Sequence, residues 1–219
     1  MLTKIIKKAY ESEQNLCFEI GSNSDLVLEN TITNNLVWTI ENFANSKRGL
    51  LTFPTKFDMV DPLLNLSGKD KVIVRMSVNP EELIRKVEFG TSSLEARITA
   101  INKLSEAGYR VGIIIAPIML VENWKKLYEN LIMILRNSLS KEACKSVFFE
   151  LIFMTYSYVH RAINHDAFPN AIELFNSNLM TGRGKGKYTY KKEIKEEGTK
   201  YMESLLHTYF PFNNILYIV

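Results

Sequence analysis

The chain has 219 residues, of which 46% are hydrophobic and 23% are charged, which is the composition of an ordinary soluble globular protein. This composition excludes a disordered chain, a collagen-like fibre and a small disulfide scaffold. The net charge is only +3, so any surface that binds nucleic acid must be a local basic patch.

The sequence predicts a cytoplasmic protein with no membrane segment. The longest apolar run, Val111–Val121, is about half the ~20 residues that a membrane-spanning helix needs. No secretory signal is recognised at the amino terminus. The two cysteines, Cys17 and Cys144, lie far apart in sequence, which fits a reducing compartment better than a disulfide framework.

Short apolar runs alternate with longer segments of helical period over residues 1–154. The expected helices are Leu2–Ser12, Thr31–Asn45, Ser92–Ala107 and Glu122–Asn137. The expected strands are Leu16–Ile20, Leu50–Phe53, Val72–Ser77, Val111–Ala116 and Val147–Phe153. Their near-continuous hydrophobicity is typical of strands that are buried on both faces. The alternation therefore predicts an α/β fold with a mainly parallel sheet that forms a partial (β/α) barrel.

Residues 155–219 are expected to form a carboxyl-terminal extension to this barrel. A basic, glycine-rich stretch, Gly182–Lys192, follows a mixed aromatic segment. A charged helix is predicted over Lys192–Tyr209 and a final strand over Ile215–Val219.

Ligands of parallel sheets bind at the carboxyl ends of the strands. The polar positions just past the predicted strand ends are Ser22–Asp25, Thr55–Asp58 and Ser77–Asn79. A structural zinc site or an iron–sulfur cluster needs three or four converging thiolates or imidazoles. The chain has two cysteines and three histidines with no metal-binding spacing, so no metal site is expected.

Seven motifs follow one another along the chain: Phe18-Glu-Ile-Gly-Ser-Asn-Ser-Asp25, Thr55-Lys-Phe57 with Val60-Asp61, Arg75-Met-Ser-Val-Asn79, Glu88-Phe-Gly-Thr-Ser-Ser-Leu94 with Arg97-Ile98, Ala107-Gly-Tyr-Arg-Val-Gly112 with Ala116-Pro117, Phe149-Glu-Leu-Ile152 and Gly186-Lys-Tyr-Thr-Tyr190. In this order they resemble the spore photoproduct lyase family of radical S-adenosylmethionine (AdoMet) proteins. The resemblance extends over nearly the whole chain.

The resemblance implies radical chemistry on DNA. In the family, a [4Fe–4S] cluster reduces bound AdoMet to a deoxyadenosyl radical, which takes a hydrogen from a thymine photoproduct so that the crosslink reverts to two thymines. The family's three cluster cysteines lie in a loop upstream of the region matched here. The chain is therefore expected to be a carboxyl-terminal portion, inactive alone. It is expected to pair with an amino-terminal portion or to self-associate through the free edge of Leu16–Ile20.

By motif position, the resemblance places Ser24, Lys56 and Ser77 against the amino-acid part of AdoMet. An ammonium group and two hydroxyls suit a carboxylate. The alternative is that the serines cap helices and the lysine is a solvated loop charge. Ser22 falls where some relatives carry the cysteine that returns hydrogen to the product radical, and a serine O–H bond is too strong for that role.

The glycine-rich stretch resembles a hairpin that engages DNA near the lesion. Arg183, Lys185 and Lys187 suit phosphate contacts, and Tyr188 and Tyr190 suit stacking on an unstacked base. A solvated basic loop is the alternative interpretation. His160 and Arg161, on a predicted helix, either border the same groove or lie on an ordinary surface.

Four further positions carry weaker expectations. Asn79, before Pro80, is expected to start a turn, and the Glu88-Phe-Gly-Thr segment is expected to be a tight turn rather than a cofactor contact. Glu150 is expected to need a partner inside the barrel, with Arg75 as one candidate. Cys17 and Cys144 are expected to be buried small residues.

Three functions remain open at this point. The chain is part of a lyase that repairs the spore photoproduct, a non-catalytic DNA-binding paralogue, or part of a radical AdoMet protein with another substrate. The departures from the family pattern at Ser22 and at Gly182-Arg183 keep the third alternative open.

Overall fold

The computed structural model describes residues 2–21, 23–46, 49–169 and 172–219. Its main sheet has six strands in the order β1-β2-β3-β4-β5-β9. The pairs β1/β2, β2/β3 and β5/β9 are parallel. The bounds of these strands are β1 Leu16–Glu19, β2 Gly49–Thr55, β3 Val72–Val78, β4 Arg110–Ile118, β5 Phe148–Phe153 and β9 Ile215–Ile218.

The first five strands follow one another in the sheet in chain order, which is the order of an opened (β/α) barrel. This confirms the predicted α/β fold and all six predicted strands, with small shifts at their ends. The connecting helices are α1 Leu2–Glu11, α2 Leu26–Thr33, α3 Asn35–Phe43, α4 Glu81–Val87, α5 Leu94–Glu106, α6 Trp124–Ser138 and α7 Lys141–Ser146, with 3₁₀ turns η1 Asp61–Leu63 and η2 Lys69–Lys71.

The carboxyl-terminal region adds a second sheet of three strands, in the order β6-β8-β7. The predicted basic hairpin is confirmed as β7 and β8, and the strand β6 beside it was not predicted. The terminal helix α9 also matches its prediction. The bounds are β6 Thr155–Ser157, α8 Tyr158–Ala167, β7 Met180–Gly184, β8 Lys187–Tyr190 and α9 Lys192–Tyr209.

The chain divides into two compact units, each made of several segments. Unit 1 comprises Met1–Ser77, Glu95–Ile113 and Leu139–Phe148. Unit 2 comprises Val78–Leu94, Ile114–Ser138 and Phe149–Val219. The predicted division at residue 154 coincides with the passage from β5 to β6 but not with the border of these units, and it stays a prediction.

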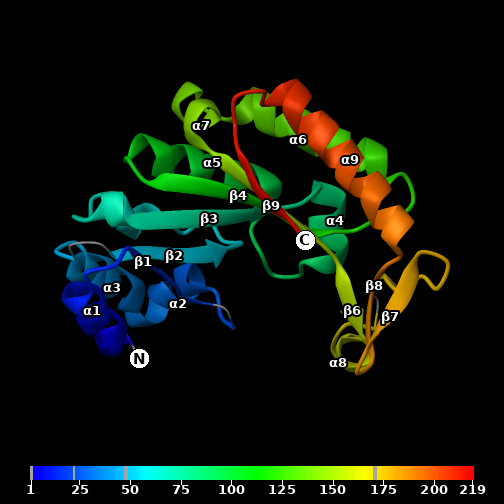
Figure 1. Cartoon of the computed structure of the whole chain (residues 1–219), viewed down its shortest axis with the longest axis horizontal. Coiled ribbons are helices and arrows are strands. Elements are labelled where there is room, and N and C mark those ends of the chain that lie inside the picture. Colours follow the sequence, from blue (N-terminus) through cyan, green and yellow to red (C-terminus); the bar gives the residue numbers. More distant parts are fainter. Residues whose placement is uncertain (1, 22, 47–48, 170–171) are drawn as a thin grey trace. The chain divides into compact units, whose positions relative to one another are not determined.

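In unit 1, one face of the sheet forms an apolar core. Alternate residues of β2 and β3 are fully buried there: Leu51, Phe53, Val72, Val74 and Met76. Helices α2 and α3 pack against β2, and Figure 1 shows them beside β1 and β2. Phe43 of α3 meets the edge of Phe18 with ring centroids 5.9 Å apart.

The predicted single helix Thr31–Asn45 is wrong, because the structure has two helices that meet at Asn34. Asn34 adopts a left-handed conformation with φ of 56°. The side-chain oxygen of Asn30 accepts hydrogen bonds from the N–H groups of Leu36 and Val37, both at 3.1 Å. These contacts satisfy the first N–H groups of α3, so the chain starts a new helix there.

In unit 2, α9 packs along α6, as Figure 1 shows. Gly198 of α9 permits a close approach to β5, because a Cβ at this position would lie 2.8 Å from the ring of Phe153. Lys125 of α6 forms an ion pair of 2.6 Å with Glu197 of α9. No helix among the described residues is long and apolar enough to cross a membrane.

Candidate cofactor and nucleic-acid site

In unit 1, one carboxylate joins the loops that follow β1 and β2. Asp25 caps α2: its Oδ1 accepts from the N–H groups of Val27 at 3.0 Å and Leu28 at 3.3 Å. The same oxygen accepts from Thr55 Oγ1 at 2.8 Å, while Oδ2 accepts from the N–H of Lys56 at 2.8 Å. Asp25 thus fixes the start of α2 to the carboxyl end of the neighbouring strand.

This arrangement determines where the predicted AdoMet residues lie. Ser24 is exposed directly before Asp25, and Lys56 is half-buried directly after β2. Because Asp25 provides the cap of α2, the alternative role of Ser24 as a helix cap is excluded.

The third predicted AdoMet residue lies in the adjacent strand. Ser77 is buried in β3, and its carbonyl accepts from Nη1 of the fully buried Arg97 at 3.0 Å. It therefore does not cap a helix either. Two hydroxyls and an ammonium group at or just past the ends of three adjacent parallel strands suit the carboxylate of an amino acid, so the residues present fit this part of AdoMet.

In unit 2, a buried polar network surrounds Asn79. Its amide donates to Glu88 Oε1 at 2.8 Å and to the carbonyl of Ala116 at 3.1 Å. The hydroxyl of Tyr128 donates to Asn79 Oδ1 at 3.3 Å and accepts from the N–H of Met119 at 2.8 Å. Burial is the main cause that raises the pKa of Tyr128, so the hydroxyl stays protonated. The network holds the chain in place just after β4.

The segment at Glu88 is a tight turn, as predicted. Gly90 has φ of 76°, and the hydroxyl of Thr91 donates to the carbonyl of Glu88 at 2.7 Å. The side chain of Glu88 is buried against Asn79, so this carboxylate serves the packing of unit 2.

The basic hairpin presents its cations to solvent. Arg183, Lys185 and Lys187 are all exposed. Lys185 and Gly186 form the two-residue loop with φ of 51° and 68°, the signs that a type I′ turn requires. The pairing shifts between Gly182 and Gly184, so Arg183 lies at a bulge, a feature that redirects a side chain.

The two hairpin tyrosines lie in different surroundings. Tyr188 is half-buried, and its ring packs edge-on against Tyr158 at 5.1 Å and Phe175 at 5.0 Å. Tyr190 is 4% exposed, and its hydroxyl accepts from the N–H of Leu120 at 2.8 Å. Tyr190 therefore anchors the hairpin and has no surface for stacking on a base, and we leave it out of the proposed DNA contacts.

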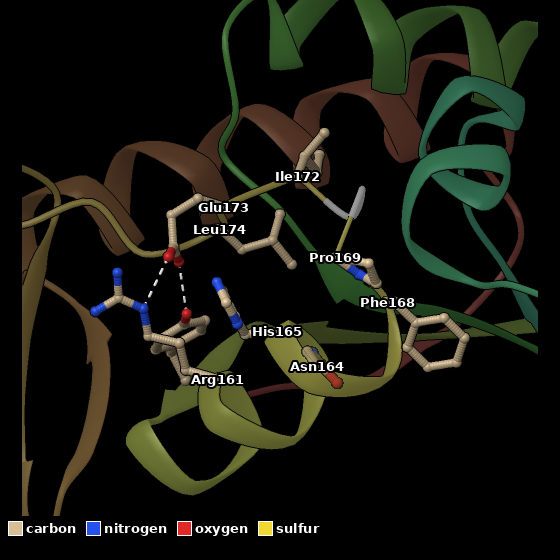
Figure 2. Close-up of a pocket in the computed structure, with 9 residues that line it drawn as sticks. Arg161, Asn164, His165, Phe168, Pro169, Ile172, Glu173 and Leu174 are labelled. Atoms are coloured by element: carbon tan, nitrogen blue, oxygen red, sulfur yellow. Dashed lines mark hydrogen bonds and ion pairs between the residues drawn. The ribbon is translucent and has the colours of Figure 1, made fainter.

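Helix α8 and the segment after it line a cavity of about 150 Å³ (Figure 2). The carboxylate of Glu173, which lines the cavity, contacts two neighbouring side chains. Its Oε2 forms an ion pair with Arg161 Nε at 2.9 Å, and its Oε1 accepts a hydrogen bond from the hydroxyl of Tyr156. Figure 2 shows the carboxylate turned toward Arg161, with Phe168 pointing away. Arg161 thus belongs to this cavity, whereas His160 is exposed on α8.

The pKa values of this cluster shift in opposite directions. Burial opposes ionisation of Glu173, but hydrogen bonds from Tyr156 and the Phe175 N–H, together with the charge of Arg161, hold its pKa below the ordinary value. Burial, and then the hydrogen bond to Glu173, raise the pKa of Tyr156 to about 12. At neutral pH the cluster is therefore an ionised carboxylate between a guanidinium and a neutral phenol.

We expect Glu173 to titrate at a lower pH than glutamate in an unstructured peptide. Its contribution to stability is then present above the unfolded-state pKa and is lost as the pH falls through the folded-state pKa. Arg161→Ala should move the midpoint upward, because it removes the cation. Carboxyl ¹³C NMR measures the midpoint, with Arg85→Ala as a control that should leave it unchanged. A midpoint at or above the peptide value contradicts the assignment.

Among the residues that the structure describes, no group of three or more histidine, cysteine, aspartate or glutamate side chains lies close enough to hold a metal ion. The prediction that Cys17 is buried is wrong: it is exposed on β1, which among the described strands pairs with β2 alone. Cys144 is half-buried in α7. Ser22 lies outside the described residues.

Sequence reasoning missed Asp25 as the residue that organises the strand-end site. The signal was present, because an aspartate directly before the apolar run Leu26–Leu28 is a typical helix cap. The predicted contact between Arg75 and Glu150 stays a prediction. Arg75 pairs with Glu19 at 3.0 Å, and Glu150 accepts from the hydroxyl of Tyr217 at 2.8 Å.

Comparisons with known proteins identify the family. The sequence profile of the family described as Spore photoproduct lyase matches residues 4–219. The spore photoproduct lyase of Bacillus subtilis (strain 168) is 35% identical over 204 residues, which are 91% of this chain and 60% of that protein. The enzyme of Clostridium acetobutylicum is 30% identical over 92% of this chain and 60% of that protein.

Solved structures give the same result. A spore photoproduct lyase double mutant with bound AdoMet and dinucleoside spore photoproduct superimposes with a TM-score of 0.92 at 28% identity. The match covers 100% of this chain and 66% of that chain. The chain belongs to the spore photoproduct lyase family of radical AdoMet proteins. It spans about three fifths of the length of the curated relatives it matches.

Proposed function

We propose that this chain supplies the AdoMet-binding and DNA-binding portion of a lyase that repairs the thymine photoproduct in DNA. The observation that carries the proposal is the set of hydrogen bonds around Asp25. They hold the Ser24 and Lys56 loops at the ends of adjacent strands, in a chain whose relatives include a structure with AdoMet and dinucleoside spore photoproduct.

In this proposal the chain positions the cofactor. The ammonium group of Lys56 pairs with the cofactor carboxylate, and the hydroxyls of Ser24 and Ser77 donate hydrogen bonds to it. Bound AdoMet, when reduced by a [4Fe–4S] cluster, supplies the group that abstracts hydrogen from the lesion. The residues of this chain act by orientation and electrostatics.

The hairpin holds the DNA. Arg183, Lys185 and Lys187 contact phosphates, because they are exposed cations on a turn with few competing carboxylates. The exposed part of Tyr188 offers an edge to an unstacked base. Contacts of this kind position the strand and do not depend on its base sequence.

The cluster is proposed to come from another segment, because the two cysteines of this chain are too few to ligate it. After anaerobic reconstitution with iron and sulfide, we expect the 219-residue chain to show no stoichiometric [4Fe–4S] absorption and no cleavage of AdoMet. A ferredoxin treated in parallel is the positive control. A stoichiometric cluster on the chain alone contradicts the assignment.

We propose that the same segment, or a second copy of the chain, pairs with the outer edge of β1. Among the described residues this strand is hydrogen-bonded on one side only, and such edges recruit further strands. Light scattering over a concentration series tests self-association. A monodisperse monomer throughout the series rules out the second copy.

A further inference from the structure

Helix α8 is attached to the basic hairpin at its first residue. The N–H of Tyr158, where α8 begins, donates to the carbonyl of Gly186 in the hairpin turn at 3.2 Å. The rings of Tyr158 and Tyr188 meet edge-on, with centroids 5.1 Å apart. The first turn of α8 therefore lies directly beside the part of the chain that is proposed to hold DNA.

The sheet of β6, β7 and β8 has an aromatic face, and Tyr188 lies on it. Tyr156 of β6 is paired with Tyr188 of β8, and directly paired residues of neighbouring strands point to the same face. The ring of Phe175 packs on both, at 5.6 Å from Tyr156 and 5.0 Å from Tyr188. Lys187 precedes Tyr188 in the same strand and therefore points to the opposite face. The hairpin cation next to Tyr188 thus does not serve the face on which a base would stack.

Arg161 is a cation on this aromatic face. It follows Tyr158 by three residues on α8, and residues at this spacing are neighbours on one side of a helix. Its ion-pair partner Glu173 accepts a hydrogen bond from Tyr156, which shares the face with Tyr188. Arg161 is therefore joined to the aromatic face twice, through α8 and through Glu173.

Glu173 holds Arg161 by one nitrogen and leaves the other two available. Nε of Arg161 lies 2.9 Å from Glu173 Oε2, while Oε1 accepts from the Tyr156 hydroxyl and from the Phe175 N–H. The structure gives Nη1 and Nη2 no hydrogen bond or ion pair with any described residue. Figure 2 shows both nitrogens on the side of Arg161 that faces away from His165. Since the side chain is 51% exposed, these donors reach solvent in a fixed orientation.

The chemistry of this arrangement selects a phosphate. The two terminal nitrogens of a guanidinium donate parallel hydrogen bonds, which match two oxygens of one phosphate group. Glu173 lies on the Nε side of Arg161, so the guanidinium separates its carboxylate from a phosphate at the other edge. Both carboxylate oxygens already accept hydrogen bonds within the protein. Glu173 therefore orients the guanidinium and leaves its outer edge open to an anion.

We propose that Arg161, oriented by Glu173, binds a DNA phosphate next to the base that meets Tyr188, an inference that rests on the proposed function and adds a contact outside the hairpin. Arg161 makes the contact, and Glu173 is a positioning residue. A phosphate contact of this kind fixes the strand on the aromatic face without reading its base sequence.

The first test compares two arginines in the whole chain, with single-stranded thymine-rich DNA as the probe. Arg161→Ala should weaken binding roughly 3–10-fold and flatten the slope of log affinity against log salt by about 1. Arg161→Lys should restore the slope but not the full affinity, because an ammonium group lacks the two parallel donors. The matched control is Arg85→Ala in α4, since Arg85 Nε also lies 2.9 Å from a glutamate oxygen, that of Glu81. If both alanine variants weaken binding equally, Arg161 contributes only its charge and the proposal is wrong.

Glu173→Gln separates orientation from charge. Removal of a negative charge by itself strengthens DNA binding. We expect the opposite, a weakening of about 2–5-fold, because an amide does not hold the guanidinium in place. In a protein that already carries Arg161→Ala, the same change should no longer weaken binding, because the two residues act through one contact. A Glu173→Gln variant that binds DNA as tightly as the parent, or more tightly, overturns the proposal.

The hairpin distinguishes failure of this inference from failure of the proposed function. If Arg161→Ala binds DNA like the parent while replacement of Arg183, Lys185 and Lys187 by alanine weakens binding, only the inference fails. If the hairpin variant also binds like the parent, the proposed DNA contact fails with it. Circular dichroism shows whether each variant is folded. Should Glu173→Gln unfold at the assay temperature, the comparison of Arg161→Ala with Arg161→Lys still decides.

Discussion

Asp25→Ala is expected to lower the free energy of unfolding by about 2–4 kcal/mol. Loss of the α2 cap costs about 1 kcal/mol. The Thr55 hydroxyl and the Lys56 N–H lose their acceptor in a partly buried place, each at a cost of about 1 kcal/mol. Urea denaturation followed by circular dichroism measures the difference.

The matched control is Asp61→Ala, which removes another aspartate from unit 1. Asp61 makes a surface ion pair with Lys103 at 2.7 Å, and its side chain is 70% exposed. Its loss should cost about 0.5 kcal/mol or less. If Asp25→Ala is no more destabilising than Asp61→Ala, the Asp25 carboxylate does not hold the strand ends together. The proposed function then loses the observation on which it rests.

The second large effect is on DNA binding. Replacement of Arg183, Lys185 and Lys187 together by alanine is expected to weaken binding of single-stranded thymine-rich DNA roughly 10–100-fold at low salt. The parent's slope of log affinity against log salt should be about −2 to −4 and should flatten by about 2 in the variant. Fluorescence anisotropy at several salt concentrations gives both values.

The fold should survive this change, because all three side chains are exposed. The matched control removes Lys4, Lys7 and Lys8 from α1, which are also exposed and carry the same charge. If the two triple variants weaken binding equally, only net charge matters. If the hairpin variant binds like the parent, the hairpin is a solvated loop and the DNA-binding interpretation fails.

The strands were predictable because each is a short, nearly continuous apolar run. The run Val111–Ala116 is apolar on both faces of a strand, which favours a position in a sheet that is covered on both sides. The helix boundaries were less predictable, since the break at Asn34 depends on a side chain, Asn30, that bonds to N–H groups six and seven residues later. A hydrogen bond between residues six or seven positions apart leaves no trace in the hydrophobic periodicity from which helices are predicted.

The helix that contains His160 and Arg161 was predicted without bounds, and it is α8. Its ends were hard to predict because none of its residues is buried. The hairpin was predictable from glycines and cations, but the burial of Tyr190 was not. Its partner is the N–H of Leu120, 70 residues away in sequence, and only the tertiary fold brings the two together.

In the candidate site too, some features were predictable from the sequence and others depend on the tertiary fold. Ser24, Lys56 and Ser77 were assigned to the AdoMet site from motif order, an assignment that stays a prediction, and their strand-end positions follow from the topology. The ion pair between Arg75 and Glu19 could not be predicted, because these two residues share a face of the sheet only through the register of three strands. Register depends on pairing, and no single segment encodes it.

Equilibrium titration of the 219-residue chain with AdoMet examines whether Ser24, Lys56 and Ser77 form the cofactor site. We expect saturable binding that Lys56→Ala weakens roughly 10-fold or more, because a charge-assisted hydrogen bond to the cofactor carboxylate is lost. Lys185→Ala, a change in the hairpin, should leave the affinity unchanged. If AdoMet fails to bind, or if Lys56→Ala binds it as the parent does, the strand-end residues do not form the cofactor site.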